Sequence, residues 1–468
     1  MKKNIFCNIL IFNIFQLIYT NKIIIPFKTS HNTAINFIES LLYNQIYAQL
    51  EVGDNKQNIY LGISTEESLF AIESVEINEF NYDCDKSSSC KKGSNLYIYN
   101  TFSKKYIEGD IFNETFYFYD NFDTQKENIK AYKNIMFGYV TKLGKGFDAY
   151  ENGYIDNNNN LISGKIGLQI TNDYNYIYHV SIIKSLKNLD LIDQLVWSIN
   201  YTNNEEGYLI IGETPSQYNE SYPEDKRRKT VCTTSPTRGF SWTLSFNDIK
   251  VGNNKLNSYR QADYSPQYGL IIGTSEYLDL IKPYFENLGK CELTQITFKE
   301  IKYSYYVCDI NVDISNFEPI KFIHTDLEND FILDKDDLFM DYNGKKYFLV
   351  LFQKNWSTQK WSLGKPFVKK YQLVFDHGSR SMYFYEYIMN NKNKEEESES
   401  NTGTIILISV CVFLGVGAIT LGIILGKIFV AEKKKKKANE LIDEINNNNG
   451  PINTETNTEY NEYTENNE

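Results

Sequence analysis

The chain has 468 residues, of which 42% are hydrophobic and 15% aromatic, and its formal net charge is −12. This length suffices for one large domain or two medium-sized domains with cores of their own. The acidic balance argues against nucleic-acid binding, because affinity for phosphate comes mainly from lysine and arginine. The many tyrosines and phenylalanines favour strands over helices.

The first apolar segment is residues 1–20, in which two lysines precede an apolar run. This pattern is typical of a secretory signal peptide; an amphipathic helix or a buried strand is the alternative. Residues 21–37 form a short lead-in to the first lobe-forming strands. Near the other end, residues 404–430 carry no charge before Lys427, and this run exceeds the ~20 apolar residues that cross a bilayer.

The segments around the apolar run 404–430 fix its predicted orientation. A polar stalk, 391–403, precedes it, and five lysines, 433–437, follow it. Lysines beside a span favour the cytoplasmic side, and the Asn- and Glu-rich tail, 431–468, is predicted to be disordered. The sequence therefore predicts a type I, single-pass protein of the secretory pathway, in a plasma, endolysosomal or vacuolar membrane.

A stripe of small residues lies within the predicted span. Ala418, Gly422 and Gly426 recur every four residues, which allows close contact between helices. The stripe predicts a weak homodimer, and a crosslinking experiment in the membrane that yields only monomers would contradict it.

Between the predicted signal peptide and the stalk, short apolar or alternating segments are separated by Gly, Asn and Asp. They predict strands at residues 44–53, 57–63, 95–102, 114–122, 207–213, 346–352 and 371–387. Within the last of these, Gly378 and Ser379 supply the turn of a hairpin. Helices are predicted only over 33–45 and 274–288. Many strands with few helices predict a mostly β protein.

Cysteines and glycosylation sequons agree with export. Outside the two apolar segments there are five cysteines, of which four could form two bridges and one is left over: Cys84, Cys90, Cys232, Cys291 and Cys308. Their spacing suggests no zinc site, and no cofactor is predicted. Four sequons predict N-glycosylation, although in an Asn-rich chain we expect some to be unused: Asn113, Asn200, Asn219 and Asn355.

Two stretches share a common plan. "NIYLGISTEESLFAI" (58–72) and "QADYSPQYGLIIGTSEYL" (261–278) each contain a strand, a serine in a polar turn and an apolar run. Two lobes of similar topology would explain the likeness, and chance is the alternative.

The stretch "WSLGKPFVKKYQLVFDHGSRSMYF" (361–384) resembles the closing signature of pepsin-like aspartic proteases. The matching positions are Trp361, Leu363, Gly364, Phe367, Tyr371, Phe375 and Asp376. Further segments resemble the family in order: 43–63 its opening strands, 97–112 its flap hairpin, 163–170 its D-G-I-L-G-L stretch with Ser163 in place of the Asp, 207–218 its inter-lobe segment, and 240–256 the start of its second lobe.

The resemblance covers residues 38–388 and implies the family fold, with two β-rich lobes, 38–208 and 209–390, flanking a cleft. It implies disulfides Cys84–Cys90 and Cys291–Cys308, and it places Tyr99 at the family's flap tyrosine. Bulky residues stand at the usual flap glycines, so the flap is expected to narrow or fill the cleft: Asn100, Phe102 and Tyr106.

The family's catalysis uses two aspartates, one in each lobe, that share a proton; one activates water and the other donates to the scissile carbonyl. A gapless match puts Ser64 and Ser265 at these two positions, while Thr65 and Ser68 agree with the family pattern. A serine hydroxyl is not ionised near neutral pH and cannot replace a carboxylate as base. The resemblance therefore implies a protein without the family's catalysis.

The sequence favours a non-catalytic surface glycoprotein that holds a peptide or protein in the cleft between the lobes. Two alternatives remain: an active endopeptidase whose carboxylates come from Glu66 and Asp263, and a surface-coat or adhesion protein with an unused cleft. A serine hydrolase is disfavoured, because Glu66 breaks the G-x-S-x-G pattern around Ser64. The four histidines lack a triad context and are interpreted as solvated or structural: His31, His179, His324 and His377.

Overall fold

The computed structural model describes a large part of residues 21–385. The described ranges are 21–30, 36–42, 46–65, 68–74, 82–100, 105–143, 162–170, 180–219, 222, 227–231, 234–235, 239–240, 242–256, 259–324, 330–354 and 360–385. The described residues all belong to one compact unit. The predicted signal peptide, stalk, span and tail lie outside the described ranges, as do Glu66, Cys232 and Asn355.

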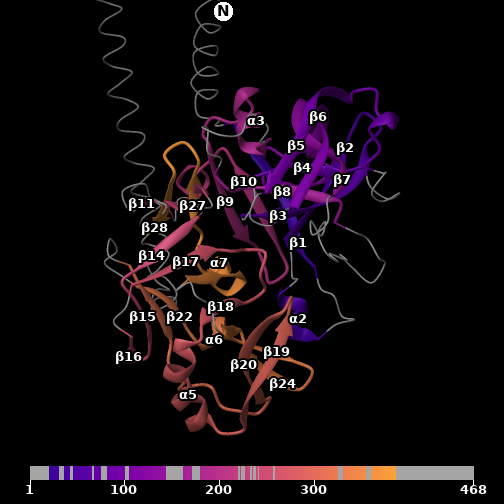
Figure 1. Ribbon diagram of the computed structural model, residues 1–468. Helices are drawn as coiled ribbons and strands as arrows, with labels where there is room; N and C mark the ends of the chain where they lie inside the picture. Colours follow the sequence, from indigo (N-terminus) through magenta and orange to yellow (C-terminus); the bar gives the residue numbers. More distant parts are fainter. Residues whose placement is uncertain are drawn as a thin grey trace, which may run out of the picture. The chain divides into compact units, whose positions relative to one another are not determined.

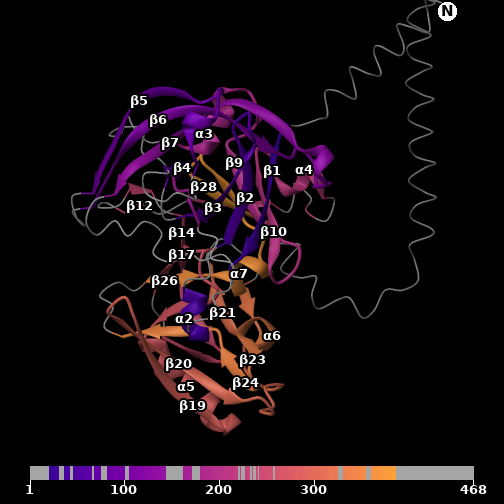
Figure 2. The same ribbon diagram turned by 90° about the vertical axis from the view of Figure 1, so that its right-hand side faces the viewer.

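The described part of the chain is mostly β, as predicted, and its largest sheet has 13 strands (Figures 1 and 2). Their order is β11 (Arg227–Val231), β28 (Ser381–Tyr385), β27 (Val374–Asp376), β9 (Val196–Tyr201), β10 (Glu206–Ile211), β1 (Ile23–Thr29), β2 (Ile46–Val52), β3 (Gln57–Ser64), β8 (Gly164–Gly167), β4 (Ala71–Glu73), β7 (Lys130–Leu143), β6 (Lys105–Phe118) and β5 (Lys91–Asn100).

A second sheet of nine strands is built entirely from residues between 243 and 363. Its order is β14 (Thr243–Phe246), β17 (Arg260–Tyr264), β26 (Lys360–Leu363), β18 (Ile271–Thr274), β25 (Val350–Gln353), β20 (Ile301–Asp309), β24 (Lys345–Phe348) and β23 (Phe339–Tyr342), with β19 (Cys291–Phe298) paired to β20.

Two smaller sheets complete the described strands. One contains β16 (Asn254–Lys255), β15 (Asp248–Val251), β21 (Ile320–Ile323) and β22 (Phe331–Leu333), and the other contains β12 (Thr234–Ser235) and β13 (Gly239–Phe240). The described helices are short apart from α5: α2 (Phe37–Leu42), α3 (Ile182–Asn188), α4 (Pro215–Tyr218), α5 (Glu276–Leu288), α6 (Lys335–Leu338), α7 (Lys365–Lys370), and the 3-10 turns η1 (Cys84–Lys86) and η2 (Lys126–Asn128).

Helix α2 connects the two large sheets. It lies in the chain between β1 and β2 of the 13-stranded sheet, yet Ile38 and Leu41 are buried in a cluster with Leu351 of the nine-stranded sheet. Both views show it beside β20 (Figures 1 and 2). Phe37 stacks on Tyr342, with ring centroids 4.1 Å apart. The apolar face of α2 thus buries itself against the sheet that is more distant in sequence.

Several predicted elements are confirmed. The helix predicted over 274–288 is α5, and α2 occupies part of the helix predicted over 33–45. The hairpin predicted within 371–387 is β27–β28, which pairs Val374 with Tyr383. Strand β1 was not predicted: it lies within the segment interpreted as a lead-in, and it pairs with β10 and β2 in the 13-stranded sheet. No helix among the described residues is long and apolar enough to cross a membrane.

A large aromatic cluster forms the centre of the core. Trp197 of β9 stacks on Phe375 of β27 with ring centroids 4.1 Å apart. Trp242 meets both rings edge-on, and Tyr264 of β17 packs on Phe375 at 4.5 Å. Because these residues come from both large sheets, a single core connects them.

Candidate functional site

The first part of the candidate site is a motif of three strands around Ser64. Strand β3 runs parallel to β8, so that Ser64, the last residue of β3, pairs with Gly167. Strand β4 then returns antiparallel to β8, with Ala71 opposite Lys165, and runs parallel to β7. The turn between β3 and β4 therefore crosses the end of β8.

The same motif recurs around Ser265. Strand β17 runs parallel to β26, with Tyr264 opposite Leu363, and Ser265 follows as the next residue. Strand β18 returns antiparallel to β26, with Ile272 opposite Ser362, and runs parallel to β25. The pairing pattern matches that of β3, β8, β4 and β7 strand for strand.

The two motifs also agree residue for residue. The same number of residues separates Ser64 from Ala71 as separates Ser265 from Ile272. Ala71 lies opposite β8 and Ile272 lies opposite β26, at equivalent positions of these two strands. The likeness of 58–72 and 261–278 therefore reflects a shared topology. Ser64 and Ser265 occupy equivalent positions in two copies of one motif.

In each motif a glycine lies in close contact with the backbone of the turn that follows the serine. A Cβ atom on Gly167 would overlap backbone atoms of Leu69, and one on Gly364 would overlap the carbonyl oxygen of Leu270. Gly167 lies opposite Ser64, and Gly364 follows Leu363, which lies opposite the residue before Ser265. Each position requires glycine, because the chain after the serine passes directly over it and leaves no room for a Cβ atom.

A direct hydrogen bond joins the two motifs. Thr65 is 4% exposed, and its Oγ1 donates to the carbonyl oxygen of Tyr264 at 2.7 Å and lies 3.4 Å from Oε1 of Gln267. Tyr264 immediately precedes Ser265, so the residues that flank the two serines are in contact. The structure thus brings together Ser64, Thr65 and Ser265.

We expect Thr65→Val to lower the free energy of unfolding by about 2 kcal/mol, because it leaves a buried carbonyl without its donor. Urea denaturation of the purified protein measures the change. Thr65→Ser retains the hydroxyl and is the matched control. An equal loss in both variants would show that packing of the methyl group, rather than the bond, matters.

The two serines differ in their surroundings. Ser265 is 1% exposed, and its N–H donates to the carbonyl oxygen of Leu363 at 3.0 Å. Ser64 is half-buried, and its carbonyl oxygen accepts from the N–H of Leu168 at 2.8 Å. Ser68 is half-buried in the same turn, next to Gly167.

The candidate carboxylate near Ser265 is already paired. The side chain of Asp263 forms an ion pair with Lys360 at 2.6 Å and accepts from Oγ1 of Thr243 at 2.5 Å. Strand pairing causes this, since β17 lies between β14 and β26, which carry these two partners. Glu66, the other candidate carboxylate, lies outside the described residues.

The predicted flap is a β-hairpin in its backbone. Strand β5 pairs antiparallel with β6, and Tyr99 lies opposite Tyr106. The side chains of these two residues, and the residue Phe102, lie outside what the structure describes. Strand β5 is the last strand on its side of the 13-stranded sheet.

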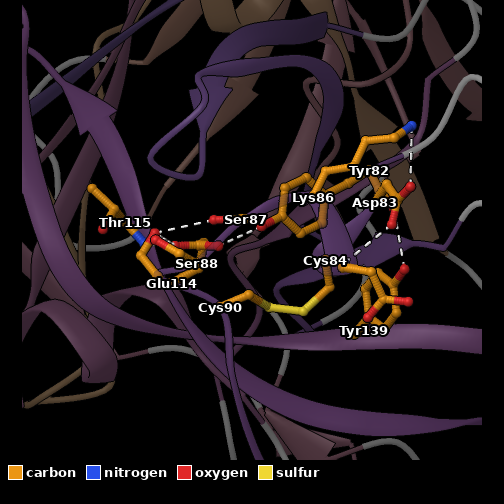
Figure 3. Close-up of a disulfide and its surroundings, with 12 residues drawn as sticks. Tyr82, Asp83, Cys84, Lys86, Ser87, Ser88, Cys90, Glu114, Thr115 and Tyr139 are labelled. Carbon is orange, nitrogen blue, oxygen red and sulfur yellow. Dashed lines mark hydrogen bonds and ion pairs between the residues drawn. A yellow bond between two sulfur atoms is a disulfide. The ribbon is translucent and has the colours of Figure 1, made fainter.

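Both predicted disulfides are confirmed. Cys84 and Cys90 close a small loop with Cα atoms 5.7 Å apart, shown in Figure 3. Cys291 and Cys308 face each other across β19 and β20.

The loop between Cys84 and Cys90 holds two carboxylates that sequence reasoning missed. Ser87 donates to Asp54 at 3.0 Å. The carboxylate of Glu114, 1% exposed, accepts from the hydroxyls of Tyr82 and Ser89 and lies beside Thr115 in Figure 3. Burial, and then the bond to Glu114, raise the pKa of the Tyr82 hydroxyl. The serines of the loop were the available signal.

We expect Tyr82→Phe to cost about 2 kcal/mol of stability, because a buried carboxylate loses a charge-assisted hydrogen bond. The measurement is chemical denaturation under non-reducing conditions, so that the disulfide stays intact. Tyr60→Phe is the matched control, since Tyr60 lies half-buried on β3. Equal stability of the Tyr82→Phe and Tyr60→Phe variants would contradict the prediction.

The remaining predicted positions differ in accessibility. Asn219 is exposed, whereas Asn113 and Asn200 are half-buried on β6 and β9. His324 and His377 are buried, which excludes a solvated position for these two; His31 and His179 lie outside the described ranges.

No model of a known protein family matches the chain, and no curated protein does.

Proposed function

We propose that this protein is a membrane-anchored, catalytically inactive counterpart of the pepsin-like aspartic proteases, in which two β-rich lobes hold a peptide or protein ligand. The observation that carries the proposal is the pair of equivalent motifs. Each presents a serine where the resembled family has an aspartate, and Thr65 of one bonds to Tyr264 of the other.

The chemistry of the two positions favours binding over hydrolysis. Hydroxyl and backbone groups can donate to and accept from an extended peptide, but they cannot take a proton from water near neutral pH. Loss of a general base alone costs ~10²–10⁴ in rate, and both carboxylates are replaced here. The pairing of Asp263 with Lys360 further argues against its use as a substitute base.

The proposed setting is the extracellular or lumenal side of a membrane. The apolar runs 1–20 and 404–430 support it, and so do the two disulfides, which persist in oxidising compartments. The proposal includes no cofactor and no nucleic acid.

The burial of Ser265 favours a second candidate function. Ser265 is 1% exposed. The turn that follows it is bound to α2, because the N–H of Gly269 donates to the carbonyl oxygen of Leu41 at 2.8 Å. These contacts favour a second motif that is closed to ligands. The protein would then be a surface-coat or adhesion protein with an unused cleft.

The first experiment tests catalysis. The purified full-length protein is incubated with an unfolded protein substrate from pH 3 to pH 6, with and without a transition-state-mimicking peptide inhibitor. We expect no cleavage at any pH. Cleavage that the inhibitor blocks would overturn the proposal and support an active endopeptidase.

The second experiment separates the two remaining functions. A random peptide library is selected on the intact protein and on Ser64→Trp, which fills the first motif, with Ser315→Trp at an exposed turn as the matched control. Peptides that bind the wild type and Ser315→Trp but not Ser64→Trp support ligand binding at the paired motifs. Equal selection on all three, or none on any, supports the unused cleft.

A further inference from the structure

His377 lies at the junction between the aromatic core and the first motif. It follows β27 directly and is 8% exposed. Its Nε2 lies 3.2 Å from the carbonyl oxygen of Leu168, and its ring centroid is 5.2 Å from that of Trp242. The same carbonyl oxygen accepts from Nε1 of Trp242 at 2.6 Å.

The bond to Leu168 fixes the neutral form of the ring. A carbonyl oxygen can only accept, so Nε2 of His377 carries the hydrogen and Nδ1 keeps a lone pair. Nδ1 is buried and has no hydrogen-bond partner among the described residues. A second proton on this ring would therefore place a charge and an N–H group where nothing accepts them.

The charged groups around the ring do not compensate for this. Burial has the largest effect and lowers the pKa of His377 to about 4. Lys184 of α3 also lowers this pKa, whereas the bond to Leu168 and the charge of Asp376 raise it. The carboxylate of Asp376 is itself held by Ser379 at 2.7 Å and by Tyr383 at 2.9 Å.

Leu168 connects the ring to the candidate site. Its carbonyl oxygen accepts from His377, and its N–H donates to the carbonyl oxygen of Ser64 at 2.8 Å. Leu168 also follows Gly167, the residue paired with Ser64 in the first motif. A change in the protonation of His377 therefore acts on the segment that holds the Ser64 turn.

We propose that His377 is an acid-sensitive latch: the closed packing cannot hold a proton at the buried Nδ1, so the protonated ring moves out to solvent, loses its bond to Leu168 and releases the end of β8 from the Ser64 turn. The latch is closed at neutral pH and loosens in an acidic compartment. It rests on the contacts of His377 and does not depend on whether the site binds a peptide.

The expected effect of pH on the opening of the latch follows from the difference in the pKa of His377 between the closed and the open state. In the closed state the ring titrates at about 4, and in an open, solvated state near its ordinary value of 6.5. The stability of the closed state is therefore full above pH 6.5 and falls as the pH drops toward 4. Between pH 7.5 and pH 5 the opening equilibrium rises about 30-fold.

Hydrogen exchange at the amide of Leu168 tests the latch, because this N–H is protected by its bond to Ser64. Exchange of the full-length protein is measured from pH 7.5 to pH 4.5 and corrected for intrinsic rates. We expect protection to fall about 30-fold by pH 5 in the wild type. His377→Gln retains a donor but cannot titrate, and its profile should be flat.

His324→Gln is the matched control, since His324 is also buried but packs near Phe246 in the second sheet. It should retain the wild-type profile at Leu168. A flat profile in the wild type, which needs no variant to fold, would overturn the proposal. So would a His377→Gln variant that still loses protection in acid.

Discussion

Replacing Gly364 with alanine is expected to destabilise the protein by about 3 kcal/mol, because overpacking against rigid backbone forces the chain to shift. The added Cβ would overlap the carbonyl oxygen of Leu270, which belongs to the turn after Ser265. Gly167→Ala should have a similar effect, since its Cβ would overlap backbone atoms of Leu69 in the equivalent turn. Urea denaturation monitored by tryptophan fluorescence measures both changes.

Gly344→Ala is the matched control for these two variants. Gly344 has a φ of +71°, and a Cβ there would meet no atom within 4 Å. Only backbone strain remains, so the expected cost is about 1 kcal/mol. If Gly364→Ala were no more destabilising than Gly344→Ala, the close approach at the second motif would be wrong.

Breaking the ion pair between Lys22 and the buried Glu213 should destabilise the protein by about 3–5 kcal/mol, because a buried carboxylate then loses the ammonium that offsets its desolvation. The ammonium lies 2.5 Å from Oε2 of Glu213, a residue that is only 3% exposed. The same ammonium also lies 5.3 Å from the centre of the Phe122 ring. Lys22→Met retains the length of the side chain and removes the charge.

Two further variants separate charge from packing at this site. The double variant Lys22→Met, Glu213→Gln removes both charges, and we expect it to recover more than half of the loss. Lys28→Met breaks a pair with Glu206 in which both side chains are well exposed, and should cost less than about 1 kcal/mol. A single Lys22→Met variant as stable as Lys28→Met would contradict the prediction.

The local features of the fold could be predicted from the sequence. Alternating or apolar segments predicted some of the strands, among them β2, β3 and β10, and Gly378 with Ser379 identified the hairpin β27–β28. The position of Ser64 and Ser265 in similar strand–turn–strand stretches indicated the repeated motif that β3 and β17 form. These features follow from the backbone preferences of a few neighbouring residues, which a single sequence displays.

The long-range features could not be predicted, since they depend on partners that are distant in the chain. Nothing in the sequence of Phe37–Leu42 indicates that helix α2 packs on the nine-stranded sheet. The pairing of Asp263 with Lys360 and the burial of Glu114 depend on which strands become neighbours. His377 was interpreted as solvated or structural, and neither its burial nor its contact with the Leu168 carbonyl could be predicted from the sequence.

The placement of β27 has a consequence for synthesis of the chain. Phe375 pairs with Trp197, although the whole nine-stranded sheet is encoded between them. During translation β9 and β10 leave the ribosome long before β27, so one edge of β9 stays unpaired while the rest of the 13-stranded sheet can form. An unpaired edge of this kind invites association with other chains. We therefore expect nascent chains truncated before residue 374 to depend on chaperones, and to reach their native solubility only when β27 and β28 have emerged.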